Sequence, residues 1–185
     1  MLDLRQINTS WTLFLDRDGV INEEKHDSYI FHYGEFTFYQ QAKEALKIFA
    51  TTFGRIVIVT NQRGVGKGMM TADDLQVIHE KMVGAIVLAG GRIDRIYYAD
   101  SLDNDHPLRK PQTGMALAAR ADFPEIDFQR SLMVGNNISD MEFGKNAGMH
   151  TVFLRTTQPE LALPHPSIDL TFNSLYDFAK SLLLK

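Results

Sequence analysis

The run Ile56–Val59 is the feature that most constrains the fold of this chain. Four consecutive β-branched aliphatic residues predict a strand that is buried on both faces, which is typical of a parallel sheet covered by helices. Similar apolar runs alternate along the chain with segments whose apolar residues recur at helical spacing. This alternation predicts an α/β fold: a Rossmann-like, doubly wound, mainly parallel sheet with helices on both faces and right-handed crossovers.

The two patterns also give approximate element bounds. We expect strands at 11–15, 55–60, 93–99, 131–135 and 151–154, with a last edge strand at 168–172. We expect helices at 41–51, 72–89, 112–121, 141–147 and 175–184. No repeat, low-complexity tract or linker interrupts them, and 185 residues suffice for one well-buried core, so we expect a single domain over residues 1–185.

Composition excludes several functional classes. The net charge of -4 gives no electrostatic case for binding nucleic acid or an anionic membrane. The chain contains no cysteine, which excludes disulfides, thiolate zinc sites and cysteine nucleophiles. We see no signal peptide at the N-terminus and no apolar run near the ~20 residues of a membrane-spanning helix. We therefore expect a cytoplasmic protein, with a monomer favoured.

Polar clusters follow the predicted strands where each strand ends. In a doubly wound sheet the carboxyl ends of the strands converge on one crevice, which is where such sheets bind ligands. Each of these residues could instead be an ordinary turn residue or helix cap. Their shared location favours a site, and the candidates are Asp16, Asp18, Thr60, Asn61, Lys110, Asn136 and Asp140.

This set of side chains suits phosphoryl transfer. One carboxylate can attack phosphorus and form an aspartyl-phosphate, while a second protonates the leaving alkoxide and then activates water. Two anions that face a phosphate need positive charge, which a lysine and a Mg²⁺ ion bound by carboxylate oxygens can supply. A threonine hydroxyl can donate a hydrogen bond to a phosphoryl oxygen.

The order and spacing of these motifs resemble the haloacid dehalogenase-like (HAD) superfamily over nearly the whole chain. The segments 15–22, 60–62 and 109–111 resemble more specifically its branch of histidinol phosphatases and D-glycero-D-manno-heptose 1,7-bisphosphate phosphatases. That branch has no large cap domain. The resemblance implies Asp16 as nucleophile, Asp18 as general acid/base, Lys110 as charge balance, Thr60 and Asn61 on the phosphoryl group, and Arg109 on the substrate.

Two departures from the branch matter. Its members often hold zinc with three cysteines and a histidine before the Arg-Lys-Pro motif, whereas the loop 100–108 here offers only His106, so we predict no zinc. The acidic residue that usually binds magnesium after the fourth strand is Asn136 here. Its carbonyl can join Asp16 and Asp18 as a ligand but brings no charge. Three alternatives stay open: Asn136 is a weaker ligand, Asp140 helps through a bound water, or the domain turns over poorly and mainly binds phosphorylated ligand.

Two loops border the expected crevice. The glycine-rich segment 64–68 lacks the spacing of a nucleotide-binding P-loop. We interpret it as a flexible substrate loop in which Arg63 or Lys67 could meet a second phosphate. The long connection 21–39 is either a functional loop or a solvated surface hairpin.

The sequence therefore predicts a magnesium-dependent phosphomonoester hydrolase that acts on a small phosphorylated metabolite. The expected substrate is a sugar bisphosphate such as D-glycero-D-manno-heptose 1,7-bisphosphate. Histidinol phosphate and a 3′-phosphorylated nucleic-acid end are alternatives with the same chemistry, and the acidic net charge disfavours the second. A catalytically weak phosphate-binding module is the alternative from another class.

Overall fold

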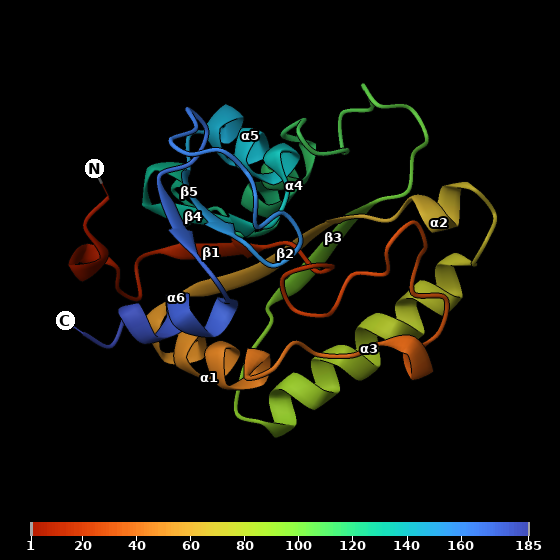
Figure 1. The fold of residues 1–185 in the computed structure, drawn as a ribbon, viewed down its shortest axis with the longest axis horizontal. Helices are drawn as coiled ribbons and strands as arrows, with labels where there is room; N and C mark the ends of the chain where they lie inside the picture. The colour runs from red at the N-terminus through yellow and green to blue at the C-terminus, as the bar shows by residue number, and fades with distance from the viewer. Residues whose placement is uncertain (1, 185) are drawn as a thin grey trace.

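The computed structural model describes residues 2–184 and contains one six-stranded sheet (Figure 1). All neighbouring strands are parallel, in the order β3-β2-β1-β4-β5-β6. This confirms the predicted doubly wound α/β fold, and no large cap domain covers the described part of the sheet. The strands are β1 (Thr12–Leu15), β2 (Arg55–Asn61), β3 (Arg95–Ala99), β4 (Ser131–Gly135), β5 (His150–Leu154) and β6 (Leu170–Phe172).

Helices cover both faces of the sheet. One face carries α1 (Ala42–Thr52), α3 (Ala72–Leu88) and α6 (Leu175–Ser181), and the other carries α4 (Gly114–Asp122) and α5 (Ile138–Ala147) (Figure 1). A single turn, α2 (Arg63–Gly66), follows β2. Short 3₁₀ helices span Leu4–Gln6, Tyr33–Glu35 and Phe128–Arg130. None of the helices in residues 2–184 is long and apolar enough to span a bilayer.

Side chains of each central strand alternate between two cores. Leu13 and Leu15 of β1 pack on the side of α1, α3 and α6, whereas Phe14 between them packs on the side of α4 and α5. Ile56 and Ile58 of β2 lie in the first core, and the intervening valines lie in the second. The β-branched run is therefore apolar at every position because both faces of its strand are buried.

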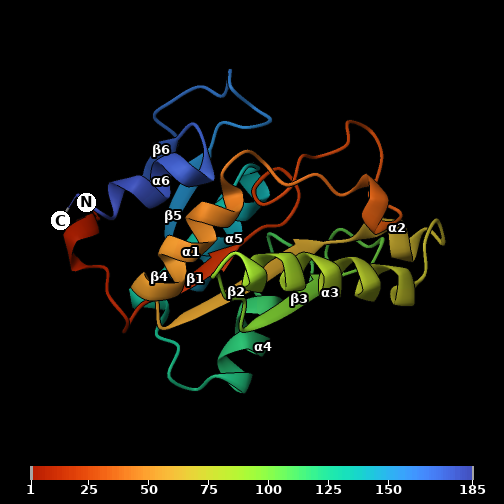
Figure 2. The same cartoon turned by 90° about the horizontal axis from the view of Figure 1, so that it is seen from below.

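The order of strands reverses between β1 and β4. Leu15, the last residue of β1, is in register with Ile58 of β2 and Val134 of β4, so the three carboxyl ends lie side by side. Both ends of the described chain lie together at the opposite end of the molecule (Figures 1 and 2). The structure therefore places its ligand-binding edge at the switch point of the sheet.

Several boundaries differ from the sequence prediction. Helix α5 begins at Ile138 rather than 141, because Asn137 caps it and Asp140 accepts a hydrogen bond from the Asn137 backbone in a capping box. The prediction of a flexible loop at 64–68 was wrong, since its first residues form α2 and Gly68 ends the turn at φ 67°. Helix α4 begins at Gly114, after the turn made by Arg109–Gln112, and β3 begins at Arg95.

The packing of the core can be tested at the cluster of aromatic rings formed by Phe49, Phe53 and Phe178. Phe49 is fully buried, and its ring lies 5.8 Å from that of Phe53 and 5.4 Å from that of Phe178, centroid to centroid. We expect Phe49→Ala to lower the free energy of unfolding by about 3–5 kcal/mol, because it leaves a cavity between two helices. Urea unfolding measures this loss. Leu88→Ala, at a site 91% exposed, is the control, and an equal loss in both variants would contradict the packing described.

Candidate active site

A cavity of about 250 Å³ opens at the carboxyl ends of β1, β2 and β4. Asp16 directly follows β1, and its backbone N–H donates to the Val134 carbonyl of β4 at 3.0 Å. Gly19 turns the chain away at φ 78°, a conformation that glycine adopts at little cost. Lys67, the alternative to Arg63 for a second phosphate, is not among the residues that line this cavity. The other predicted site residues all line it: Asp16, Asp18, Thr60, Asn61, Arg63, Arg109, Lys110, Asn136 and Asp140.

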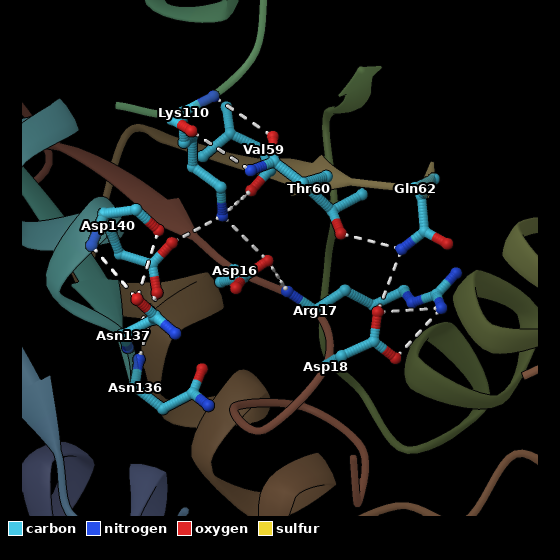
Figure 3. A network of polar contacts seen from close by, with 12 residues as sticks. Asp16, Arg17, Asp18, Val59, Thr60, Gln62, Lys110, Asn136, Asn137 and Asp140 are labelled. Carbon is cyan, nitrogen blue, oxygen red and sulfur yellow. Dashed lines mark hydrogen bonds and ion pairs between the residues drawn. The ribbon is translucent and has the colours of Figure 1, made fainter. Parts of the chain in front are cut away.

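Lys110 is the buried centre of the site (Figure 3). Its Nζ lies 2.9 Å from Asp16 Oδ1 and 2.7 Å from Asp140 Oδ1, and it donates to the Val59 carbonyl at 2.8 Å. Burial alone would lower the pKa of Lys110, but the charges of Asp140 and Asp16 outweigh it and raise the pKa, so the lysine stays charged. All three ammonium protons have acceptors, so Lys110 acts on a ligand through its charge.

Asp16 points one oxygen at these donors. Its Oδ1 accepts from the Arg17 backbone N–H at 2.7 Å and from Lys110. No hydrogen bond in residues 2–184 engages its Oδ2. Burial, together with the negative charge of Asp140, raises the pKa of Asp16 to about 7 against the opposing effect of Lys110. A further positive charge in the cavity would therefore favour the ionised carboxylate that a nucleophile needs.

Asp18 is held by three side chains. Arg17 Nη2 lies 2.9 Å from both carboxylate oxygens, Asn22 Nδ2 donates to Oδ1 at 2.9 Å, and Gln62 Nε2 donates to Oδ2 at 2.9 Å. Burial would raise the pKa of Asp18, but the charge and hydrogen bond of Arg17, with the bonds from Asn22 and Gln62, lower it below its usual value. These three side chains therefore keep Asp18 ionised and fixed in place.

Arg17 is itself buried, with only 1% of its surface exposed. Its Nη1 lies 3.2 Å from Nε2 of His79 on α3. Burial, and then the charge of Arg17, lower the pKa of His79 to about 3. His79 is therefore neutral and can accept a hydrogen bond from the Arg17 guanidinium, so α3 supports Asp18 through Arg17.

Thr60 and Asn61 differ in the hydrogen-bonding groups that they leave available for a ligand. Thr60 Oγ1 accepts from Gln62 Nε2 at 2.9 Å, which leaves its own hydroxyl proton available. The Asn61 side chain is used on the backbone of Lys110, accepting from its N–H at 3.1 Å and donating to its carbonyl at 3.3 Å. The observed contacts of Asn61 therefore hold Lys110 in place.

Asn136 lines the cavity, and two side chains hold its amide nitrogen. Its Nδ2 donates to Thr157 Oγ1 at 2.7 Å and to Glu24 Oε2 at 3.2 Å, while its Oδ1 is buried with no hydrogen-bond partner among residues 2–184. Gly19 makes this placement possible, because a Cβ there would lie 2.0 Å from Nδ2. Figure 3 shows the Asn136 oxygen on the side of Asp16.

These oxygens fit a hard cation. The described residues contain no group of three acidic, histidine or cysteine side chains that could hold a metal. A cation site here therefore depends on Asp16 and Asp18 together with an amide oxygen, and the unpartnered Oδ1 of Asn136 supplies one. Carboxylate and amide oxygens are the donors that Mg²⁺ accepts, with water completing its shell.

Asp140 uses both oxygens on the protein. Oδ1 pairs with Lys110, and Oδ2 accepts from the backbone N–H groups of Asn136 and Asn137 at 3.2 and 3.0 Å. Gly135 makes room for it, because a Cβ there would lie 2.3 Å from the Asp140 Cβ. Asp140 therefore supports the site by pairing with Lys110 and by holding the turn that carries Asn136.

Two arginines border the outer part of the cavity. Arg63 Nη2 donates to the Leu102 carbonyl at 2.9 Å and to Asn104 Oδ1, so it anchors the loop 100–108. Arg109 lines the cavity with a buried Nη1 that has no partner in the part of the chain described. Burial, and then the charge of Arg63, lower the pKa of Arg109. The Arg109 guanidinium is therefore a positive charge in the cavity wall whose Nη1 has no acceptor among residues 2–184.

Sequence reasoning missed several residues that the structure places at the site. Arg17, Asn22 and Gln62 lie within the quoted motifs, but only the fold shows that they converge on Asp18. His79 is buried behind Arg17, and nothing around it in the sequence marks it as a partner of that arginine. The connection 21–39 contributes Glu24, Lys25, Ser28, Tyr29 and Ile30 to the cavity wall. The functional interpretation of that loop therefore accounts for its position better than a solvated hairpin does.

Comparison with known proteins identifies relatives of this chain. Residues 107–178 match the model of a family described as HAD-hydrolase-like. A D-glycero-alpha-D-manno-heptose-1,7-bisphosphate 7-phosphatase of Mycobacterium tuberculosis is 34% identical over 170 residues, 91% of this chain and 90% of the relative. A protein of the same name from Burkholderia mallei is 37% identical over 155 residues, 77% of this chain and 78% of the relative.

A solved structure shows the same fold. A D,D-heptose 1,7-bisphosphate phosphatase from B. bronchiseptica, complexed with magnesium and phosphate, superposes with a TM-score of 0.84 at 25% identity, and the match covers 94% of this chain and 98% of the other. The fold and these matches define an enzyme that hydrolyses phosphoric monoesters. The chain belongs to the HAD superfamily and, within it, to the family of D-glycero-D-manno-heptose 1,7-bisphosphate phosphatases. The family resemblance inferred from the motifs is thereby confirmed.

The neutral state of His79 predicts a pH dependence of stability. Its pKa is about 3 in the folded protein against 6.5 in the unfolded chain, so the unfolded state binds more protons between these values. Stability therefore falls as pH drops through this window, and this one group contributes a loss of about 2 kcal/mol between pH 7 and pH 5. Urea unfolding at both pH values measures it.

His79→Gln is the matched variant, because glutamine can accept from Arg17 but does not titrate. We expect the variant to lose less stability on acidification than the parent by about that amount. Equal losses in the two proteins would mean that His79 is not held neutral.

Proposed function

We propose that this protein is a magnesium-dependent phosphatase that removes phosphate from a sugar bisphosphate, such as D-glycero-D-manno-heptose 1,7-bisphosphate, through an aspartyl-phosphate on Asp16. One observation carries the proposal. The Asp16 carboxylate lies 2.9 Å from the buried Lys110 ammonium, in a single cavity with Asp18 and the Thr60 hydroxyl. A nucleophile, an acid/base and donors for phosphoryl oxygens thus share one small space.

The first step transfers the phosphoryl group to the enzyme. Asp16 Oδ2, which carries no hydrogen bond from residues 2–184, attacks phosphorus as the bond to the ester oxygen breaks. Asp18 gives a proton to the departing alkoxide, which leaves as the alcohol. Asp18 must enter this step protonated, and a dianionic phosphate beside it raises its pKa. The products are an aspartyl-phosphate and the dephosphorylated sugar.

The second step returns the enzyme to its starting state. The Asp18 carboxylate takes a proton from a water molecule, whose oxygen attacks phosphorus as the bond to Asp16 breaks. Inorganic phosphate leaves, and Asp16 is again a carboxylate. The clamp of Arg17, Asn22 and Gln62 holds Asp18 in line for both transfers.

Charge balance is shared between the chain and the cation. Lys110 stabilises negative charge through space, and the Thr60 hydroxyl donates to a phosphoryl oxygen. A Mg²⁺ ion held by oxygens of Asp16, Asp18 and Asn136 would supply the positive charge that keeps Asp16 ionised and neutralises the phosphoryl oxygens. The B. bronchiseptica relative is complexed with magnesium and phosphate, which supports magnesium as the cation.

A second anion on the substrate fits Arg109. Its buried, unpartnered Nη1 lines the same cavity, so a substrate with two phosphates can place one at Asp16 and the other toward this cation. Histidinol phosphate carries an amine cation that Arg109 would repel, and the relatives at 34–37% identity are named for heptose bisphosphates. Both facts favour the sugar bisphosphate.

The loop 100–108 is held in place by contacts with protein groups. Arg63 holds the loop 100–108 through two contacts, and the His106 Nδ1 accepts from the Leu108 N–H at 3.3 Å. We therefore propose that protein contacts alone order this loop. The phosphate-binding module remains the second candidate, and its support is the missing charge at Asn136.

Phosphate release from a panel of sugar phosphates, with and without Mg²⁺, tests the proposed function. We expect fastest release from a heptose 1,7-bisphosphate with Mg²⁺, and a fall of at least about 10³-fold in Asp16→Asn, which removes the nucleophile. Asp27→Asn is the matched control, because Asp27 lies on an exposed turn at φ 55°, where asparagine is tolerated. Activity that survives Asp16→Asn would overturn the assignment, and no release from any substrate would favour the binding module.

Arg109→Gln tests the second anion site. Loss of a charge-assisted contact should raise KM for the bisphosphate by about 10- to 100-fold and leave kcat nearly unchanged. The corresponding monophosphate, which lacks the second anion, should change far less. Arg130→Gln, on a surface 3₁₀ helix, is the control. An equal rise in KM for both substrates would place Arg109 on the transferring phosphate instead.

A further inference from the structure

The orientation of the Asn136 amide depends on Glu24. An ionised carboxylate can only accept hydrogen bonds, so the amide atom that faces Glu24 Oε2 at 3.2 Å must be the nitrogen. The oxygen is thereby turned to the side of Asp16 (Figure 3), where it is buried without a partner in the described chain, and the Asn136 residue lines the cavity. Asn136 is 3% exposed, so the amide has no solvent to satisfy it in another orientation.

Thr157 cannot fix this orientation by itself. Its hydroxyl accepts from Asn136 Nδ2 at 2.7 Å, which is the shorter of the two contacts. A hydroxyl can also donate, so it would tolerate the amide in either orientation. The longer hydrogen bond to Glu24 therefore determines which way the Asn136 amide is turned, and the shorter hydrogen bond to Thr157 does not.

Glu24 also brings charge to the same space. It lines the cavity with Asp18, and the amide that it contacts is neutral. A cation bound there meets the two aspartates and an amide oxygen, with the charge of Glu24 behind the amide. Because no three acidic side chains are gathered closely enough to form a metal site within residues 2–184, we treat Glu24 as acting through Asn136.

We propose that Glu24 is a positioning residue that makes Asn136 a cation ligand, by holding its amide oxygen toward the cavity and adding negative charge behind it. This inference rests on the magnesium site of the proposed function. It concerns how the chain binds the cation and does not depend on which substrate is hydrolysed.

Calorimetric titration of the full chain with MgCl₂ tests the proposal without any turnover. We expect Glu24→Gln to weaken Mg²⁺ binding by about 10-fold, because glutamine can donate or accept and removes a charge. Thr157→Val should weaken it less than about threefold, since the orientation is kept. Glu23→Gln, the neighbouring carboxylate outside the cavity wall, is the matched control and should bind like the parent.

Asn136→Asp completes a double-mutant cycle. A carboxylate offers an oxygen on either side and brings its own charge, so this variant should bind Mg²⁺ more tightly than the parent. Adding Glu24→Gln to it should then weaken binding less than it does in the parent, because only the charge of Glu24 and not the amide orientation is lost, and this difference is the coupling that the proposal requires.

Three results would overturn the proposal: Glu24→Gln binding like Glu23→Gln, a loss as large in the Asn136→Asp background as in the parent, or no detectable Mg²⁺ binding by the parent. The proposed function fails separately, through phosphate release that is indifferent to Asp16→Asn. A protein that passes the calorimetry and fails the release assay would bind the cation as inferred here but not be the phosphatase described.

Discussion

The buried ammonium of Lys110 is the contact on which the rest of the site depends. It joins Asp16 after β1, the carbonyl of Val59 in β2 and Asp140 in α5, although the lysine itself follows β3 by a long loop. A buried lysine is costly unless its partners satisfy it, and without it two buried carboxylates would face each other unpaired. One side chain thus unites four segments that are far apart in the sequence.

The support of the site is built from ordinary structural devices. Asp140 completes the capping box of α5 and pairs with Lys110 through the same carboxylate, so the start of a helix also fixes the turn that carries Asn136. Asn61 holds the backbone of Lys110, and His79 of α3 holds Arg17 behind Asp18. Rigid strands and helix ends therefore supply the pre-organisation that phosphoryl transfer needs.

The sequence predicts the sheet well and the supporting contacts poorly, for physical reasons. Runs of β-branched residues such as Ile56–Val59 predict buried strands directly, and parallel strands bring the residues that follow them to one edge of the sheet. Arg17 is harder to place, because arginine is seldom fully buried and only the fold shows a histidine behind it. The hydrogen bonds of Asn61 to the Lys110 backbone and of Asn136 to Glu24 depend on loop conformation and amide orientation, which residue spacing does not encode.

The guanidinium anchor of the rim loop has a consequence for where the enzyme can work. Arg63 ties the loop 100–108 to α2 through a carbonyl and an amide oxygen, in a chain that has no cysteine. Oxidants therefore have no thiol to attack in this region. The contacts that hold this loop at the mouth of the pocket are therefore ones that thiol oxidation leaves intact.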